Sequence, residues 1–284
     1  MTTIANYRNC STGGIRALDL QLIAQIQRIA PGVLVRFDHL PVALGAGCHP
    51  YLQAPAVAAL DKAIGLRKQQ IKINSAYRTI AQQAVLYAQY KNRRCGILAA
   101  AAPGKSNHNT ALAIDVGDAQ GWRPYLERFG WDWIGSFDPM HFDFEGNGCR
   151  NINYFSILAF QQIWNRNYPK LAIAEDGTWG GATEKALMQT LITGFGLGST
   201  VSVLGSTHSH DVAKESKIAS MRWGDRSKDV LLLQERLNGA GFGLVEDGNF
   251  GKATLDAVRE FQRHKGLVID GVVGMATKKA LSIS

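Results

Sequence analysis

One phrase recurs three times in the second half of the sequence and constrains its fold more than any other feature. It reads DGTWGGATEKAL at 176–187, DGNFGKATLDAV at 247–258 and DGVVGMATKKAL at 270–281. Each copy has Asp-Gly, an apolar anchor two residues after that glycine (Trp179, Phe250 or Val273), another glycine, and Ala-Thr leading into a helix. Asp-Gly favours a turn and glycine permits unusual backbone angles. Repetition of this kind predicts a small helical module whose parts share one core.

The rest of the chain divides by composition. We expect a larger N-terminal domain over 1–150, a helical repeat-like segment over 151–195 and a compact C-terminal module over 223–284. Residues 196–222 are rich in Gly, Ser and Thr and poor in aromatics, which indicates a flexible linker. His208 and His210 lie in that linker and are expected to be solvated.

The N-terminal domain shows helical patterns before strand patterns. Apolar spacing predicts helices over about 15–30, 54–67, 79–93 and 122–129. Alternation predicts short strands over 71–74, 111–116, 131–134 and 141–144. This order favours an α+β fold, a small antiparallel sheet with flanking helices, over a regular βαβ repeat.

Two histidines and an aspartate form a candidate metal site. His108 precedes the strand that carries Asp115, and His141 begins the alternating sequence His-Phe-Asp-Phe. Two imidazoles and a carboxylate are the ligands of a catalytic zinc ion, and Asp138 could take a proton from its water. Taken singly, His108 reads as a loop histidine and the two aspartates as turn caps. Together the four residues predict a metal-dependent hydrolase.

Several other polar residues have two interpretations. Arg78, where a strand gives way to a helix, could hold a substrate carboxylate or form a surface ion pair. Asp143 and Glu145 are solvated carboxylates or supports for the site. The cysteines are Cys10, Cys48, Cys95 and Cys149. They form no C-x-x-C pair, which argues against a thiolate zinc site or a thioredoxin-like motif. Either two disulfides or four buried thiols are expected.

Net charge leaves several kinds of partner open, whereas hydropathy argues against a membrane span. The net charge of +8 suits nucleic acid, an anionic membrane or an anionic wall polymer equally. No segment of the sequence approaches the run of about 18 apolar residues that a membrane-spanning helix needs. The N-terminus has no apolar core of the signal-peptide type, so we expect another export route or release by lysis.

The motifs around the candidate site resemble a known family. S-x-H-x-x-x-x-A-x-D, then D-x-x-H, preceded by S-x-Y-R-T and Gln83, is similar to the zinc D-alanyl-D-alanine carboxypeptidases. That family includes vancomycin-resistance carboxypeptidases and phage endolysins that cleave L-alanyl-D-glutamate bonds. The resemblance covers about 35–145, with Ala111 where the family usually has Gly and Met140 where some members have Trp.

The resemblance implies roles for individual residues. His108, Asp115 and His141 would bind one zinc ion, Asp138 would be the general base, and Arg78 would stabilise substrate or transition state. The residues implied to contact substrate are Ser106, Tyr77, Gln83 and Arg78.

The C-terminal residues resemble a second family. Residues 225–284 are similar to the peptidoglycan-binding domain found beside many wall hydrolases, and residues 154–191 are similar to part of it. The two resemblances together imply a monomeric D-alanyl-D-alanine carboxypeptidase at the bacterial cell wall. Its expected partner is peptidoglycan, with no nucleic acid and no membrane span. The alternatives are an endolysin-like endopeptidase, cutting an L-alanyl-D-glutamate bond or a cross-bridge, and a non-catalytic wall-binding protein.

Overall fold

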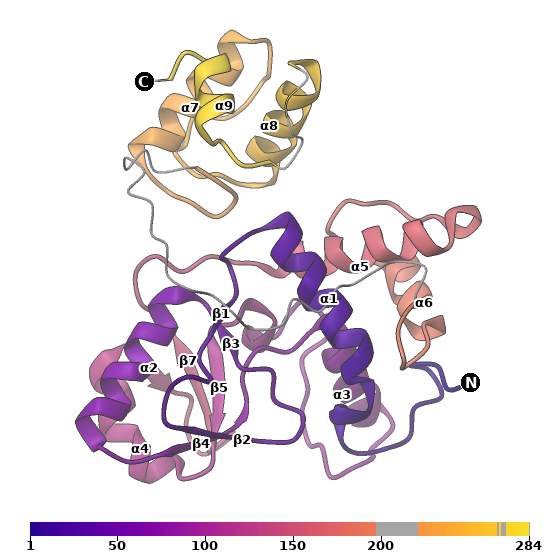
Figure 1. Cartoon of the computed structure of the whole chain (residues 1–284), viewed down its shortest axis with the longest axis vertical. Coiled ribbons are helices and arrows are strands. Elements are labelled where there is room, and N and C mark those ends of the chain that lie inside the picture. The colour runs from indigo at the N-terminus through magenta and orange to yellow at the C-terminus, as the bar shows by residue number, and fades with distance from the viewer. Residues whose placement is uncertain (197–220, 266, 268–270, 284) are drawn as a thin grey trace. The chain divides into compact units, whose positions relative to one another are not determined.

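A computed structural model describes residues 1–196, 221–265, 267 and 271–283 (Figure 1). The chain divides into two compact units, residues 1–201 and 202–284, which we call unit 1 and unit 2. Most of the expected linker, with His208 and His210, lies outside the described residues. No helix in the described part of the chain is long and apolar enough to cross a membrane.

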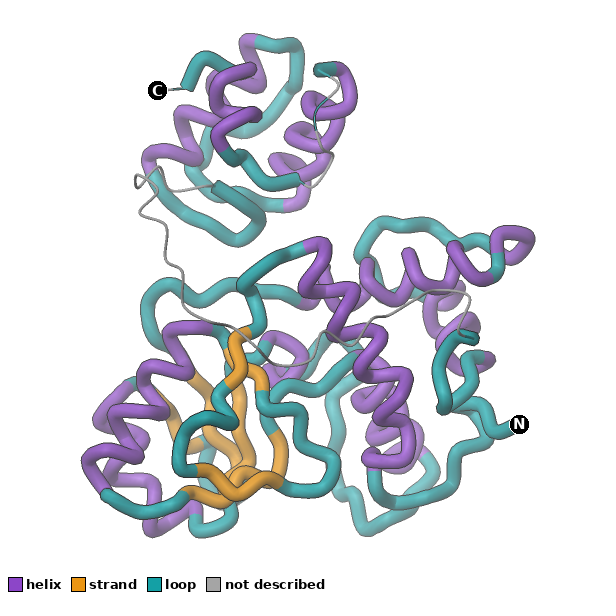
Figure 2. The backbone as a smooth tube through the Cα atoms, viewed as in Figure 1, coloured by secondary structure: helices purple, strands orange, loops and turns teal. Residues whose placement is uncertain are grey.

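Unit 1 contains a five-stranded sheet in the order β2-β4-β5-β7-β6. Its strands are drawn in orange in Figure 2. These strands are β2 (Val42–Leu44), β4 (Ile71–Ser75), β5 (Ala113–Val116), β7 (His141–Phe144) and β6 (Trp131–Trp133). β2 and β4 run parallel, and every other neighbouring pair is antiparallel. A separate antiparallel pair joins β1 (Val35–Arg36) to β3 (Tyr51–Leu52). The α+β prediction is confirmed, with one parallel strand pair in a mainly antiparallel sheet.

Two apolar cores hold unit 1 together. In the first, α2 (Ala54–Arg67) and α4 (Ala119–Leu126) pack with the sheet around Leu60, Trp122 and Phe142. In the second, α1 (Arg16–Ile29) and α3 (Ile80–Lys91) pack with α5 (Asn153–Asn167) and α6 (Gly181–Gln189) around Leu18 and Phe160. Residues 151–195 therefore lie in the same compact unit as residues 1–150.

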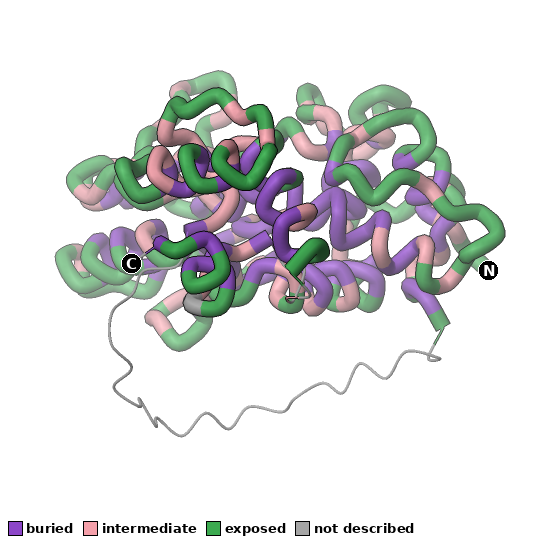
Figure 3. The backbone as a smooth tube through the Cα atoms, turned by 90° about the horizontal axis from the view of Figure 1, so that it is seen from above, coloured by how far each residue is buried: buried purple, intermediate pink, exposed green. Residues whose placement is uncertain are grey.

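Unit 2 is a small helical module, as the repeats predicted. Its helices, among the described residues, are α7 (Lys228–Gly239), α8 (Lys252–His264) and α9 (Met275–Ala280). The repeat anchors Phe250 and Val273 are fully buried in it. Figure 3 shows the buried stretches of the described chain in purple and the exposed ones in green.

Each of the three repeat copies has the same arrangement of buried hydrogen bonds, centred on a glutamine side chain. In the first copy the side-chain amide of Gln161 accepts from the backbone N–H of Gly177 at 2.8 Å and donates to the hydroxyl of Thr183 at 3.1 Å. In the second, Gln234 makes the same two bonds at 2.8 and 3.1 Å. Their partners are Gly248 and Thr254. The glycines adopt positive φ angles of 62° and 68°, which favour glycine.

The third copy repeats this arrangement from Gln262, which accepts from Gly271 at 2.9 Å and donates to Thr277 at 3.2 Å. The first copy lies in unit 1 and the other two lie in unit 2. Because all three copies make the same hydrogen bonds, residues 151–195 have the local structure of one repeat of the C-terminal module.

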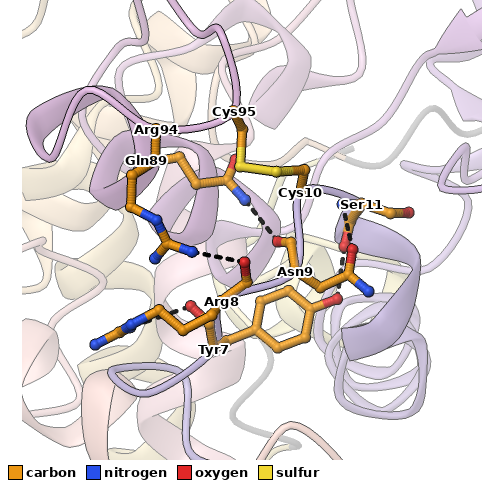
Figure 4. Close-up of a disulfide and its surroundings, with 8 residues drawn as sticks. All are labelled: Tyr7, Arg8, Asn9, Cys10, Ser11, Gln89, Arg94 and Cys95. Atoms are coloured by element: carbon orange, nitrogen blue, oxygen red, sulfur yellow. Dashed lines mark hydrogen bonds between the residues drawn. A yellow bond between two sulfur atoms is a disulfide. The ribbon is translucent and has the colours of Figure 1, made fainter.

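The cysteines follow neither sequence expectation in full. One disulfide joins Cys10 to Cys95, which ties the N-terminal segment to the chain just after α3 (Figure 4). Beside it, Arg94 donates to the carbonyl of Arg8 at 2.7 Å and Gln89 to that of Asn9 at 2.9 Å. Cys48 is a buried free thiol and Cys149 a partly exposed one.

Candidate metal centre

Two neighbouring strands and a short helical turn bring the candidate ligands together. Asp115 on β5 and His141 on β7 are direct cross-strand partners in the antiparallel register. His108 lies in the 3-10 turn Asn107–Thr110, which leads into β5. Across the described residues, these three form the one group of His, Cys, Asp or Glu side chains whose potential ligand atoms all lie within 4.8 Å of one another.

The three ligand atoms form a nearly equilateral triangle. His108 Nε2 lies 3.2 Å from His141 Nδ1 and 3.2 Å from Asp115 Oδ1, and His141 Nδ1 lies 3.1 Å from Asp115 Oδ1. Zinc–ligand bonds of 2.0–2.1 Å in a tetrahedron give edges of about 3.3 Å. The triangle therefore has the size of one face of a tetrahedral zinc site, with the fourth position left for a water or substrate.

Outer hydrogen bonds aim both imidazoles at the centre of this triangle. His108 Nδ1 donates to the carbonyl of Ala76 at 2.7 Å, which leaves the lone pair on Nε2 facing inward. His141 Nε2 lies 2.9 Å from Asp143 Oδ1, which leaves Nδ1 as the inward atom. Carbonyl and carboxylate partners of this kind orient metal-binding histidines in many proteins. Two lone pairs and a carboxylate that converge in this way repel one another unless a cation lies between them.

In the metal-free site, the pKa values of the two histidines and Asp115 are all shifted, and that of His141 moves in the direction that reduces this repulsion. Burial and the charge of Arg78 lower the pKa of His108. Burial also disfavours the His141 imidazolium, but hydrogen bonds to Asp115 and Asp143 outweigh it and raise the pKa of His141 to about 9. Burial opposes ionisation of Asp115, yet both imidazoles and Arg78 hold its pKa well below the ordinary value. Without metal, a proton on His141 thus supplies the positive charge that the site requires.

Arg78 forms an ion pair with the candidate ligand Asp115 rather than with a surface carboxylate. Its Nη2 donates to Asp115 Oδ2 at 2.7 Å and its Nε donates to Ser75 Oγ at 3.0 Å. The side chain is only 20 % exposed. Because Oδ2 is occupied by Arg78, Asp115 offers its other oxygen, Oδ1, to the centre. Among the described residues, no hydrogen bond involves Nη1 of Arg78, which leaves that donor available to a ligand.

Asp138 lies in the turn that leads into β7. Its backbone carbonyl accepts from the N–H of His141 at 3.1 Å, and its half-buried carboxylate acts electrostatically on Arg78. It is not one of the three clustered ligands. This position close to the ligands, but outside their group, is compatible with the general-base role that the sequence resemblance implies.

The three further residues expected at the substrate have bonds within the protein. Ser106 caps the turn that carries His108 by accepting from its N–H at 3.3 Å. Tyr77 is fully buried with its hydroxyl 3.0 Å from Ser156 Oγ, and Gln83 is buried and donates to the carbonyl of Ala101 at 2.7 Å. The contacts of Tyr77 and Gln83 argue for support of the site and against direct substrate binding.

The structure adds two details to the loop that carries His108. Asn109 is fully buried, donates to the carbonyl of Arg78 at 2.8 Å and accepts from the N–H of Gly104 at 3.0 Å. It ties the loop that carries His108 to the turn that carries Arg78, and its only sequence signal is its place next to a ligand. Ala111 has a φ of 58° in the left-handed region, which explains why a glycine suits this position.

Comparisons with known proteins agree with both expected resemblances. Residues 51–129 match the family model for D-alanyl-D-alanine carboxypeptidase. Residues 226–281 match the model for a putative peptidoglycan binding domain. The first match includes His108 and Asp115 and ends before Asp138 and His141, so these last two residues rest on the motif and the geometry.

Two curated relatives come from Bacillus licheniformis. The N-acetylmuramoyl-L-alanine amidase CwlL is 35 % identical over 80 residues, which are 27 % of this chain and 22 % of the relative. A probable N-acetylmuramoyl-L-alanine amidase is 37 % identical over 86 residues, which are 29 % of this chain and 24 % of the relative. The chain thus spans less than a quarter of each relative's length.

Proposed function

We propose that the protein is a zinc-dependent D-alanyl-D-alanine carboxypeptidase that acts on peptidoglycan stem peptides and binds the same polymer through unit 2. The single observation that carries this proposal is the triangle of His108, Asp115 and His141, whose ligand atoms are separated by 3.1–3.2 Å. The family match over 51–129 supports the reaction class, and the match over 226–281 supports the polymer.

The donor set fits zinc better than the other common divalent metals. Two imidazoles and one carboxylate in a compact triangle suit a borderline ion with four ligands, whereas magnesium and calcium prefer six or more oxygens. When bound, zinc supplies a Lewis acid and lowers the pKa of its water towards neutrality.

The protein's own residues supply the remaining chemistry. Asp138, beside the ligands, accepts a proton from the attacking water and then delivers it to the leaving amine of D-alanine. Arg78, held by Asp115 and Ser75, presents Nη1 to the scissile carbonyl or to the terminal carboxylate of the substrate. Asp143 holds His141 in the orientation that directs Nδ1 inward.

In this proposal unit 1 carries out the hydrolysis and unit 2 attaches the enzyme to the polymer. Unit 2 would keep the enzyme on its polymer and raise the local concentration of stem peptides around unit 1. The net charge of +8 suits an anionic wall.

A defined stem pentapeptide tests the proposal. Mass spectrometry after incubation with the zinc-loaded full chain should show loss of one terminal D-alanine, and a chelator should stop the reaction. An internal cut would contradict the carboxypeptidase assignment in favour of an endopeptidase. An intact pentapeptide, together with intact peptidoglycan, would overturn the enzymatic proposal and leave a wall-binding protein.

A further inference from the structure

The repeat copy in unit 1 differs from its counterparts in where its anchor lies. Phe250 and Val273, the anchors of the two copies in unit 2, are fully buried. Trp179 occupies the same place in the first copy but is only partly buried, and it lines a hollow between α3 and α6. The buried network around Gln161 is nevertheless intact, so the loop that carries Trp179 is held by the same two hydrogen bonds as in the other copies.

The hollow has the chemistry of a sugar-binding site. Trp179 from the repeat loop and Tyr87 from α3 supply aromatic surface, and Met188 adds an apolar wall. Lys91 and Glu184, both exposed, supply charged hydrogen-bonding groups at its edge. Aromatic faces with nearby polar groups suit a pyranose ring, which has apolar C–H faces and a polar rim of hydroxyl and acetamido groups.

The size of the hollow limits what it can hold. Its volume is about 230 Å³. Pockets for drug-sized ligands run from about 300 to 1,000 Å³. A space of this size suits one or two rings of a longer chain better than a whole small-molecule ligand.

The hollow is joined to the metal centre by a short piece of chain. Pro103 lines the hollow, and His108 lies five residues further on. Five residues span at most about 18 Å, which is also the reach of an extended stem pentapeptide. Beside Pro103, a methyl group placed on Gly104 would lie 3.1 Å from Ile157 Cδ1 and 4.0 Å from Trp179 Cβ, so the repeat lies directly against the loop that carries the ligand.

We infer that this hollow is a second binding site for the peptidoglycan glycan strand, in which Trp179 and Tyr87 hold an N-acetylated sugar while the attached stem peptide extends to the metal centre. The inference rests on the proposed function for the identity of the polymer. It assigns to residues 151–195 a role in positioning substrate on unit 1, in addition to attachment through unit 2.

The test uses a ligand without peptide, the disaccharide N-acetylglucosaminyl-N-acetylmuramic acid, and the full chain. The indole N–H resonance of Trp179, assigned by its loss in Trp179→Leu, should shift as the disaccharide is added. In Tyr87→Leu the apparent dissociation constant should rise about tenfold, the change that 1.4 kcal/mol represents. Because the signal belongs to Trp179, binding of sugar to unit 2 does not contribute to it.

Tyr168→Leu is the control, since it makes the same substitution at an exposed tyrosine of unit 1. Its ring contacts are Trp164 and Phe195, and none of these three residues lines the hollow. This variant should bind as the unmodified chain does. If Tyr87→Leu fails to fold, Lys91→Ala replaces it at an exposed position, with a severalfold weakening expected. No shift of the Trp179 resonance, or equal affinity in all these chains, would overturn the inference.

Failure of the proposed function would look different from failure of this inference. The disaccharide contains no peptide bond of the stem, so its binding is independent of hydrolysis. A chain that binds the disaccharide at Trp179 but leaves the stem pentapeptide intact would retain the sugar site and lose the carboxypeptidase assignment.

Discussion

His141 Nδ1 and Asp115 Oδ1 face each other across β7 and β5 at 3.1 Å. An antiparallel register places opposite side chains on the same face of a sheet, so this pair is fixed by the backbone before any metal binds. Only His108 has to be added from outside the sheet, and its loop is held by Ser106 and Asn109. The centre is therefore largely preorganised by the fold of unit 1.

Asp143 should matter for metal affinity although it is not a ligand. Asp143→Asn weakens the hydrogen bond that holds His141 Nε2, and we expect zinc affinity to fall about 10- to 100-fold. Competition with a fluorescent chelator measures this. Asp132→Asn is the matched control, because Asp132 is the exposed cross-strand partner of Asp143 on β6. Equal affinities of the two variants would show that the Asp143 bond has no such role.

Zinc affinity should depend on pH through His141. With a pKa of about 9 in the metal-free protein, His141 carries a proton at neutral pH that the metal must displace. Affinity should therefore rise about tenfold per pH unit from pH 6 to 8 and level off above pH 9. Calorimetric titration in buffers of different ionisation enthalpy measures both the affinity and the released proton. A constant affinity across this range would contradict the assigned proton.

Asp138 should affect turnover and leave the metal in place. Asp138→Asn keeps the shape of the side chain but removes the base, so we expect kcat to fall about 10²- to 10⁴-fold. Zinc content should remain that of the unmodified chain, because Asp138 lies outside the ligand group. Glu145→Gln, at an exposed carboxylate after β7, serves as the control and should keep full activity. Unchanged kcat in Asp138→Asn would move the general base elsewhere.

The shared glutamine network predicts matched losses of stability in the two units. Gln161→Leu leaves the N–H of Gly177 and the hydroxyl of Thr183 without their partner and should lower the free energy of unfolding of unit 1 by about 1–3 kcal/mol. Gln234→Leu should do the same to unit 2. Hydrogen exchange resolved by segment separates the two effects, and each variant is the control for the other. Loss of protection in both units from either variant would contradict this separation.

The sequence predicted most of the elements that carry the site. Helix 54–67 matches α2 and strand 141–144 matches β7, because both have clear apolar periodicity. The sequence did not predict β1, β2 and β3, which have only two or three residues each. Helix α4 begins at Ala119, before the expected Trp122, because the Asp118 side chain caps it by accepting from Gly121.

The candidate ligands could be named from the sequence, whereas the residues that hold them in place could not. His108, Asp115 and His141 follow from spacing and motif, but the roles of Asp143 and Asn109 depend on side-chain directions that spacing does not determine. The disulfide joins residues 85 positions apart, a separation that contains no local signal. Tyr77 and Gln83 lie within the family motif, yet only the structure shows that both point into the core.

Zinc content measured by atomic emission tests the central claim most directly. The purified full chain should hold one zinc ion, Asp115→Ala and His141→Ala should hold none, and Asp138→Asn should hold one. A full chain that takes up no zinc, or an Asp115→Ala variant that binds it as tightly as the unmodified chain, would contradict the metal centre described for unit 1.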